Sequence, residues 1–214
     1  MDCGKPDSRD AGLTWMDCSL LLGSKSPRRR ELIARLGLPC RTVEIDVEET
    51  LTHTMAASEV AESLARKKCE AFSGRMEDNE VLVTADTVVV HGGTVMGKPH
   101  SRQEAVEMLR LLSGSVHQVY TGVALRGKGF SFSFSEKTDV LFSRLSDVEI
   151  DYYVDVYRPF DKAGAYGIQE WIGMIGIERI EGCYYNVMGL PVARLYKELK
   201  RLVNGDGSVV DQRP

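Results

Sequence analysis

Apolar and polar residues alternate along the chain in blocks whose period and length predict a series of strands and helices. Short runs of apolar and β-branched residues predict strands at 18–23, 41–45, 81–83, 87–90, 95–96, 118–125 and 132–142. Apolar residues spaced three and four apart predict helices at 27–36, 58–72, 101–112, 146–156 and 191–203, and Ser58, Ser101 and Ser146 are the expected N-caps of three of them. The segment 159–182 is rich in glycine and aromatic residues, and its pattern predicts no regular element.

The runs at 81–83 and 87–90 are almost continuously apolar, which is typical of a sheet that is covered on both faces. No internal repeat or low-complexity linker divides the chain, and its 214 residues suffice for one sizeable core. The sequence therefore predicts a mixed α/β fold with a single domain at 17–203. We expect the polar segment 1–16 to be a mobile extension and 204–214 to be a flexible tail.

Charge and composition narrow the classes of function. The net charge is −4, whereas a protein that binds duplex nucleic acid usually carries a basic surplus, so no nucleic-acid partner is expected. No apolar run approaches the roughly 18–20 residues that span a bilayer, so no membrane association is expected. The five cysteines form no CxxC pair and the four histidines no ligand pattern, which argues against a zinc site or a disulfide framework. The simplest expectation is a reduced, cytoplasmic protein.

Two hydroxyls and three arginines gather where the first strand is expected to run into the first helix, in Ser24-Lys25-Ser26-Pro27-Arg28-Arg29-Arg30. Ser26 and Pro27 suit the N-cap and the first position of a helix. The free N–H groups of a helix N-terminus favour an anion, and guanidinium groups match phosphate oxygens. This segment indicates either a site for a small anionic ligand or an ordinary capped helix with solvated arginines.

Asp86 is a second candidate, because it lies where an apolar side chain is expected, between Val81 and Val90. Burying an unpaired charge is costly, so a metal ion, a lysine or a catalytic water must compensate for it. Carboxylates in such places serve as general bases or Mg²⁺ ligands. The alternative interpretation is a carboxylate at a strand end that caps a neighbouring turn.

Three further polar residues could reach a cleft. Lys68 continues the apolar stripe of the helix at 58–72, Lys98 lies in a short loop, and Gln169 ends a patch rich in glycine. A glutamine amide pairs a donor with an acceptor and can therefore read the edge of a base. Each of the three also has a structural interpretation, as a lysine stem along an apolar surface, a solvated lysine and an exposed amide.

Neither a GxxxxGK[ST] phosphate loop nor a GxGxxG fingerprint occurs, which argues against kinases, classical NTPases and nicotinamide enzymes. Instead, the patches together resemble the Maf family of nucleoside triphosphate pyrophosphatases, which was first linked to septum formation in bacteria. The resemblance covers about Leu20 to Leu202. Seven elements carry it in the family's order: Ser24-x-Ser26-Pro27-Arg28-Arg29, Leu64-Ala65-x-x-Lys68, Ala85-Asp86-Thr87-Val88-Val89, Gly97-Lys98-Pro99, Leu111-x-Ser113-Gly114, Asp161-Lys162-Ala163-Gly164-Ala165-Tyr166-Gly167-Ile168-Gln169 and Asn186-Val187-x-Gly189-Leu190-Pro191.

The resemblance implies hydrolysis of a nucleoside triphosphate to the monophosphate and pyrophosphate, with Mg²⁺ or Mn²⁺ as a divalent metal cofactor. It implies a house-cleaning role that prevents the incorporation of non-standard nucleotides. It also implies an elongated mixed β-sheet flanked by helices, with a central cleft, similar to inosine triphosphatases. Members often form dimers, which leaves a homodimer open.

The resemblance also implies roles for individual residues. Asp86 would be the catalytic proton acceptor, and Glu49 and Asp86 would hold the metal. The implied substrate-binding residues are Ser24, Ser26, Arg28, Arg29, Lys68, Thr87, Lys98, Lys162 and Gln169. Arg28, Thr87 and Gln169 stand at the positions that separate subgroups, and they resemble the dTTP/UTP branch. The sequence departs from the common family pattern at 157–160 and at Glu170-Trp171.

Two alternative functions stay open on the sequence alone. The first is the same chemistry with a preference for 7-methyl-GTP. The second is a nucleotide-binding regulator of cell division that does not hydrolyse its ligand, although a buried carboxylate beside phosphates is not needed for binding alone.

Overall fold

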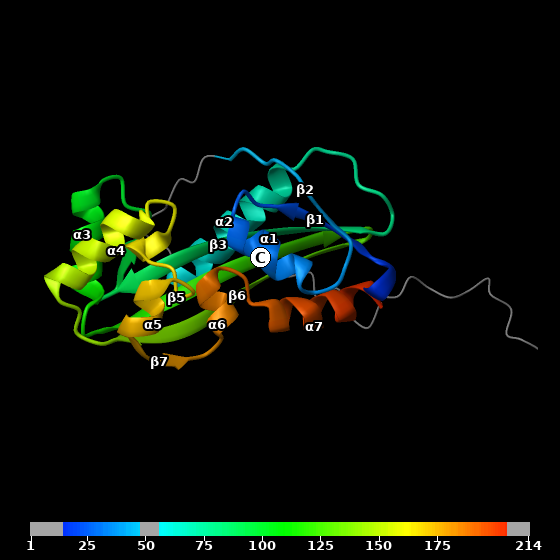
Figure 1. Cartoon of the computed structure of the whole chain (residues 1–214). Coiled ribbons are helices and arrows are strands. Elements are labelled where there is room, and N and C mark those ends of the chain that lie inside the picture. Colours follow the sequence, from blue (N-terminus) through cyan, green and yellow to red (C-terminus); the bar gives the residue numbers. More distant parts are fainter. Residues whose placement is uncertain (1–14, 48–55, 205–214) are drawn as a thin grey trace, which may run out of the picture.

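The computed structural model describes residues 15–47 and 56–204, which form a mixed α/β fold (Figure 1). Its strands are β1 (Ser19–Gly23), β2 (Cys40–Thr42), β3 (Glu80–His91), β4 (Thr94–Met96), β5 (Val116–Gly127), β6 (Phe130–Phe142) and β7 (Ile177–Glu181). Its α-helices are α1 (Pro27–Ala34), α2 (Ala57–Ala71), α3 (Arg102–Leu112), α4 (Asp147–Tyr157), α5 (Trp171–Gly176), α6 (Tyr184–Met188) and α7 (Val192–Val203). Short 3₁₀ helices occur at η1 (Trp15–Asp17) and η2 (Ala163–Ala165). The predicted fold class is confirmed.

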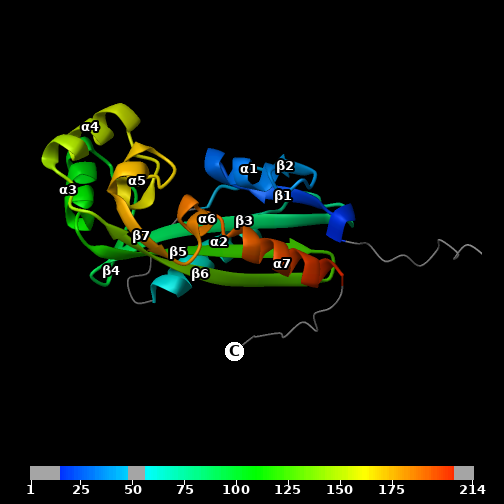
Figure 2. The same ribbon diagram turned by 60° about the horizontal axis from the view of Figure 1, so that its bottom comes forward.

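The strands form one sheet in the order β2-β1-β3-β5-β6-β7, and β4 pairs with β3 beside this path. β1 is parallel to both β2 and β3, whereas all the other pairs are antiparallel. The long central strands β3, β5 and β6 make the molecule elongated, and α3, α4 and α5 gather at one end of it (Figures 1 and 2).

Strand pairing along one edge of β3 is interrupted. β1 pairs with β3 only as far as Thr84, and β4 begins to pair with β3 at Val89. Residues 85–88 therefore have no strand partner on that edge within the described part of the chain. β5 continues along the other edge without a break, with Asp86 opposite Gly122. The interruption leaves room for side chains and a ligand at the edge of the sheet.

Successive side chains of β3 point to opposite faces of the sheet, and different helices cover each face. Val83 and Val89 pack in the main core with residues of α1, α6 and α7. On the other face, Leu82 and Val88 pack with residues of α2. Figure 2 shows α1, α6 and α7 together on one side of the sheet. The predicted covering of both faces is confirmed, and it follows that Asp86 shares the face of α2.

The strands expected separately at 81–83 and 87–90 are one strand, because Thr84, Ala85 and Asp86 stay paired with β5 between them. The alternative interpretation of Asp86 as a strand-end cap is therefore wrong. The strand expected at 41–45 is shorter and ends at Thr42. The unassigned segment 159–182 contains η2, α5 and the whole of β7.

The helix expected to begin at Ser58 begins at Ala57, since the Glu59 carboxylate accepts a hydrogen bond of 3.2 Å from the N–H of Ala56. The first helix ends at Ala34 and not at residue 36. The other N-caps are confirmed, because each serine hydroxyl accepts from the backbone N–H three residues later: Ser26, Ser101 and Ser146.

The expected extension at 1–16 and tail at 204–214 lie almost wholly outside the described residues. Among the residues that the structure describes, no helix has the length and apolar character needed to cross a membrane.

A polar residue is buried in the main core near the start of β5. His117 is fully buried, its Nε2 lies 2.8 Å from the hydroxyl of Tyr166, and its ring packs against Phe142. Burial, aided by the charge of His91 and opposed by that of Asp139, lowers the pKa of His117 to about 4. His117 is therefore neutral in the folded protein at neutral pH.

This histidine predicts a loss of stability in mild acid. Below its ordinary pKa of 6.5, the unfolded chain binds a proton that the folded protein does not bind until about pH 4. The free energy of unfolding therefore falls as the pH falls through this window. Between about pH 7 and pH 4, the free energy of unfolding should fall by about 3 kcal/mol more in the wild type than in His117→Gln, which has no titratable group at this position. Urea unfolding across this range measures the difference, and parallel profiles for the two proteins would contradict it.

Candidate active site

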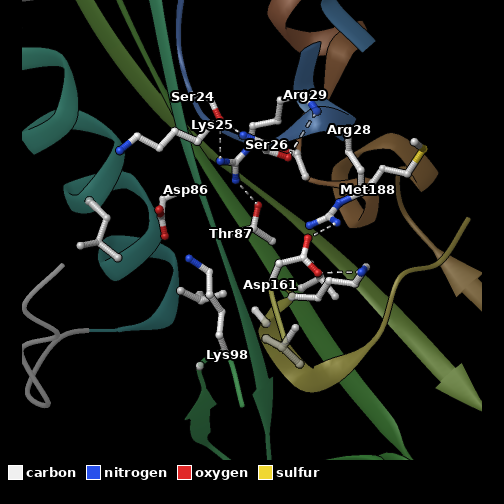
Figure 3. A pocket seen from close by; sticks show the side chains of 18 of the residues that line it. Ser24, Lys25, Ser26, Arg28, Arg29, Asp86, Thr87, Lys98, Asp161 and Met188 are labelled. Atoms are coloured by element: carbon white, nitrogen blue, oxygen red, sulfur yellow. Dashed lines mark hydrogen bonds and ion pairs between the residues drawn. The ribbon is translucent and has the colours of Figure 1, made fainter. Parts of the chain in front are cut away.

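A cleft of about 660 Å³ opens at the interrupted edge of β3. Its walls come from the loop and first turn of α1, from α2, from the loop after β4, and from the segments 161–169 and 187–189 (Figure 3). The described residues predicted to act on or bind a substrate all line it: Ser24, Ser26, Arg28, Arg29, Lys68, Asp86, Thr87, Lys98, Lys162 and Gln169. The structure therefore brings together the residues that the sequence motifs single out, while their roles toward a ligand stay predictions.

Asp86 lies in the wall of the cleft on the α2 face of β3. Its side chain is 12% exposed and forms an ion pair with Lys68 of α2, whose side chain is 15% exposed. The partner that a buried carboxylate requires is therefore a lysine, and the Lys68 ammonium does not reach out to bulk solvent. Lys98 points toward Asp86 from the loop after β4 (Figure 3). Two lysines beside one carboxylate give this end of the cleft a net positive charge, which suits phosphate groups.

The hydroxyls of Ser24 and Ser26 hold the turn before α1. Ser24 Oγ accepts a hydrogen bond of 3.2 Å from the N–H of Ser26, and Ser26 Oγ accepts one of 3.5 Å from the N–H of Arg29. Pro27 occupies the first helical position, where its missing N–H costs no hydrogen bond. This local chemistry places the N-terminus of α1 in the wall of the cleft.

Arg29 connects three segments around the cleft. Its Nε donates to the carbonyl oxygen of Gly189 at 2.7 Å, and its Nη2 donates to Thr87 Oγ1 at 2.9 Å. Its Nη1 lies 3.4 Å from Ser24 Oγ. Because these contacts come from the α1 loop, β3 and the turn after α6, Arg29 fixes the relative positions of three walls.

The donor and the acceptor can be assigned in each hydrogen bond of the chain that runs from Arg29 through Thr87 and Thr121 to Asn186. The hydroxyls of Thr87 and Thr121 are 2.9 Å apart, and Thr121 donates to the carbonyl oxygen of Asn186 at 3.0 Å. A hydroxyl has one proton, so Thr87 donates to Thr121 and accepts from Arg29. The Thr87 hydroxyl therefore has no proton left for a ligand, and it can offer only a lone pair and its methyl group.

Arg28 reaches from α1 across the cleft to the segment 161–169. Its Nη1 lies 3.0 Å from Asp161 Oδ2, and the other oxygen of Asp161 accepts from Lys162 Nζ at 2.7 Å. Burial alone would raise the pKa of Asp161, but the hydrogen bond and charge of Lys162, together with Arg28, outweigh it and hold that pKa below its ordinary value. An ionised Asp161 therefore joins two opposite walls of the cleft.

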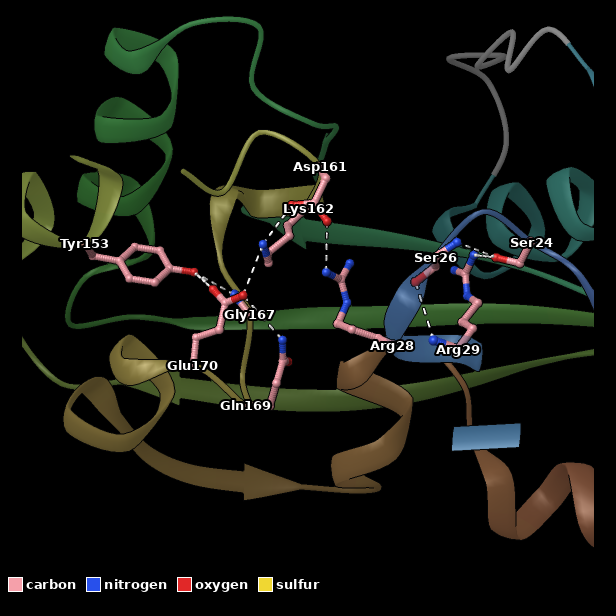
Figure 4. Close-up of polar contacts among 10 residues, drawn as sticks. All are labelled: Ser24, Ser26, Arg28, Arg29, Tyr153, Asp161, Lys162, Gly167, Gln169 and Glu170. Atoms are coloured by element: carbon pink, nitrogen blue, oxygen red, sulfur yellow. Dashed lines mark hydrogen bonds and ion pairs between the residues drawn. The ribbon is translucent and has the colours of Figure 1, made fainter. Parts of the chain in front are cut away.

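A polar network underlies the wall that carries Gln169 (Figure 4). The Lys162 side chain is 8% exposed, and its Nζ lies 3.1 Å from Glu170 Oε1. The other oxygen of Glu170 accepts from the hydroxyl of Tyr153, which is fully buried on α4. Gln169 Nε2 lies 3.5 Å from Glu170 Oε1. Glu170 is thus the residue on which this network converges.

The carboxylates of the cleft fit a metal ion that is bound partly by the protein and partly by the substrate. Among residues 15–47 and 56–204, no group of three or more His, Cys, Asp or Glu side chains could hold a metal ion. Mg²⁺ is usually bound by one or two carboxylates together with substrate phosphates and water, and Asp86 can supply one of these carboxylates. The other predicted ligand, Glu49, lies outside the described residues.

No role in the site is predicted from the sequence for Asp161, Tyr153 or Glu170, although Glu170 stands out as a departure from the family pattern beside Gln169. Asp161 begins the motif that ends at Gln169, and Glu170 directly follows it. Their positions in the sequence could therefore have indicated that both lie near the site. Tyr153 gives no such signal, because it occupies an apolar position of α4. The contact between Tyr153 and Glu170 depends on the tertiary fold.

Comparison with known proteins gives one consistent family. The model of the Maf-like protein family matches residues 19–202. A dTTP/UTP pyrophosphatase of Phocaeicola vulgatus is 52% identical over 184 residues, covering 86% of this chain and 95% of that protein. Proteins of the same name from Bacteroides thetaiotaomicron (51% over 185 residues; 86% and 95% covered) and Porphyromonas gingivalis (51% over 184 residues; 85% and 92% covered) are similar to it as well.

A solved structure of the Staphylococcus aureus Ham1 protein aligns with 88% of this chain and 100% of that chain, at 14% identity and a TM-score of 0.43. The family match spans almost all of the described residues and includes every described residue predicted to bind substrate. The relatives named above match over nearly their whole length. The chain belongs to the Maf-like protein family.

Proposed function

We propose that this protein hydrolyses dTTP and UTP, and modified pyrimidine nucleotides of the same class, to the nucleoside monophosphate and pyrophosphate. The relatives that are about half identical to it carry the name dTTP/UTP pyrophosphatase. The observation that carries the proposal is the position of Asp86, a carboxylate in the wall of a cleft with lysines on either side. Neither the preference for 7-methyl-GTP nor the role as a regulator without hydrolysis is favoured by these relatives.

The proposed reaction is attack of water on the α-phosphorus, which expels pyrophosphate. Asp86 orients the water and accepts its proton, because it is the carboxylate held at the phosphate end of the cleft. Lys68 and Lys98 stabilise the negative charge that develops on the α-phosphate and on the leaving group. Arg29 is held by its hydrogen bonds before a ligand arrives, so no reorganisation is needed when the charge develops.

We infer that the enzyme uses a divalent metal, Mg²⁺ or Mn²⁺, held by Asp86 and Glu49 together with phosphate oxygens of the nucleotide. Such an ion, when bound, neutralises phosphate charge and polarises the phosphorus–oxygen bonds. Asp86 supports this inference, since it presents a carboxylate in the cleft.

The base end of the nucleotide is proposed to lie at the opposite side of the cleft from Asp86 and Lys68. Arg28, Thr87 and Gln169 line the cleft there, and we propose that they set the choice of base. The Thr87 hydroxyl can only accept a hydrogen bond from a ligand, so its partner on a base would be an amino group or an imide N–H.

We also propose that the protein acts as one domain at 17–203 on free nucleotides in the cytoplasm, without nucleic-acid or membrane partners. The family match at 19–202 and the acidic net charge of −4 support these proposals. A homodimer is proposed from the family resemblance alone, and sedimentation measurements on the purified protein test it.

A panel of nucleoside triphosphates with Mg²⁺ or Mn²⁺ tests the proposed function. Release of pyrophosphate and monophosphate, fastest from dTTP and UTP, is the expected result. Release of orthophosphate and diphosphate would contradict the attack at the α-phosphorus. A higher kcat/KM for 7-methyl-GTP than for UTP would contradict the substrate class.

A further inference from the structure

We propose that Glu170 is a positioning residue that fixes the orientation of the Gln169 amide, so that the cleft selects a pyrimidine with an imide N–H (uracil or thymine) over cytosine. This inference rests on the proposed function and names an atomic basis for its substrate choice. Glu170 itself contacts no substrate in this proposal. It acts through the residue that precedes it in the chain.

The Glu170 carboxylate is held from two sides by strong donors. Tyr153 donates its hydroxyl proton to one oxygen, and Lys162 Nζ lies 3.1 Å from the other. Burial, together with the hydrogen bond to Glu170, raises the pKa of Tyr153, so its phenol keeps the proton that it donates. The Tyr153 oxygen also accepts from the N–H of Gly167 at 3.0 Å. The Glu170 carboxylate is therefore fixed in place by a phenol at one oxygen and an ammonium at the other.

A fixed carboxylate settles which way the neighbouring amide faces. Both oxygens of Glu170 already face donors and act as acceptors, so the Gln169 NH₂ group turns toward Glu170, where Nε2 lies 3.5 Å from Oε1. The Gln169 oxygen is then directed elsewhere. It is buried and has no hydrogen-bond partner in the described part of the protein. Since Gln169 lines the cleft, a ligand can supply the missing donor.

The donor that such an oxygen accepts distinguishes the pyrimidines. Uracil and thymine carry N3–H between two carbonyl groups, whereas N3 of cytosine is an acceptor. An acceptor on the base facing the fixed Gln169 oxygen would leave two buried acceptors without a proton between them, which is costly. If the amide were free to turn, its NH₂ group could serve cytosine, and the discrimination would be lost.

The packing of Gly167 offers a second way to disturb the same pair. A Cβ on Gly167 would lie 2.9 Å from Gln169 Nε2 and 2.8 Å from Glu170 Cδ, so both side-chain ends would have to move. The atoms displaced are the far ends of flexible side chains, so Gly167→Ala is expected to fold.

Affinities for the α,β-methylene analogues of UTP and CTP, measured by calorimetry with Mg²⁺, test the proposal without requiring turnover. The wild type should bind the UTP analogue more tightly. In Glu170→Gln the ratio of the two affinities should fall about tenfold or more, because an uncharged amide accepts or donates equally well. Tyr153→Phe and Gly167→Ala should lower the ratio in the same direction, while Glu178→Gln, an exposed charge on β7, should keep it.

Kinetics separate positioning from general damage. In Glu170→Gln the kcat/KM for UTP relative to CTP should fall in step with the affinity ratio, mainly through KM, with kcat for UTP little changed. A ratio that stays at the wild-type value in Glu170→Gln and in Gly167→Ala would overturn the proposal, as would a wild type that binds both analogues equally. If the wild type instead releases no pyrophosphate from any triphosphate, the proposed function fails, while the affinity ratios still decide the role of Glu170.

Discussion

Asp86→Asn is expected to lower kcat for UTP by roughly 10²- to 10⁴-fold, the usual contribution of a positioned general base. An amide of nearly the same shape can still occupy the wall of the cleft, but it cannot accept the proton of the attacking water. Pyrophosphate release under saturating UTP measures the effect. The bound nucleotide should still be detected by calorimetry, because Lys98 and the arginines of the cleft remain.

The matched control for this substitution is Asp78→Asn. Asp78 is also paired with a lysine, Lys128, but both side chains are exposed, at 78% and 68%. Its loss should leave kcat unchanged, since exposed ion pairs contribute little. If Asp86→Asn retained more than about a tenth of wild-type turnover while correctly folded, Asp86 would not be the proton acceptor.

Gly122→Ala is expected to destabilise the protein by about 3 kcal/mol or more, because the new methyl group meets backbone that cannot move freely. A Cβ at Gly122 of β5 would lie 2.1 Å from the carbonyl oxygen of Ala61 and 2.4 Å from the N of Glu62, both in α2. α2 therefore rests directly on the sheet at this point. Relief requires the whole helix to shift, and α2 also carries Lys68, so activity should fall together with stability.

Thermal unfolding measures the first effect, with an expected decrease in Tm of about 6–12 °C for a chain of this size. The control is Gly97→Ala, because a Cβ at Gly97 meets no atom within 4 Å. The free energy of unfolding of this variant should differ from that of the wild type by no more than about 0.5 kcal/mol. Equal Tm values for Gly122→Ala and Gly97→Ala would show that α2 does not pack on β5 as closely as described.

The element types along most of the chain were predictable because their patterns are local. The N-caps at Ser26, Ser101 and Ser146 need only a hydroxyl and an N–H three residues later, and all three are found. β3 was harder, since a strand that is apolar on both faces gives no period to show which residue faces which layer. The face on which Asp86 lies is set by the position of α2, which the pattern does not contain.

The site shows the same division. The motifs identify the residues that line the cleft, yet the ion pair between Arg28 and Asp161 joins positions 133 residues apart, and no local pattern predicts it. Tyr153 looks like core, and its hydrogen bond to Glu170 appears only when α4 packs beside the segment 161–169. Glu49 lies outside the described residues, so the predicted metal ligand stays a prediction.

Asp86 and Thr87 are consecutive, yet they face opposite layers of the molecule, one toward Lys68 on α2 and the other toward Arg29 on α1. In the proposed function, hydrolysis and the choice of base therefore belong to the two sides of a single strand. We therefore expect that a substitution on the α1 side can change which nucleotide is accepted without disturbing the proposed proton acceptor. One residue inserted in β3 would exchange the two faces and is expected to abolish both proposed functions. We therefore expect the choice of substrate in proteins with this fold to change by point substitutions and not by insertions or deletions in β3.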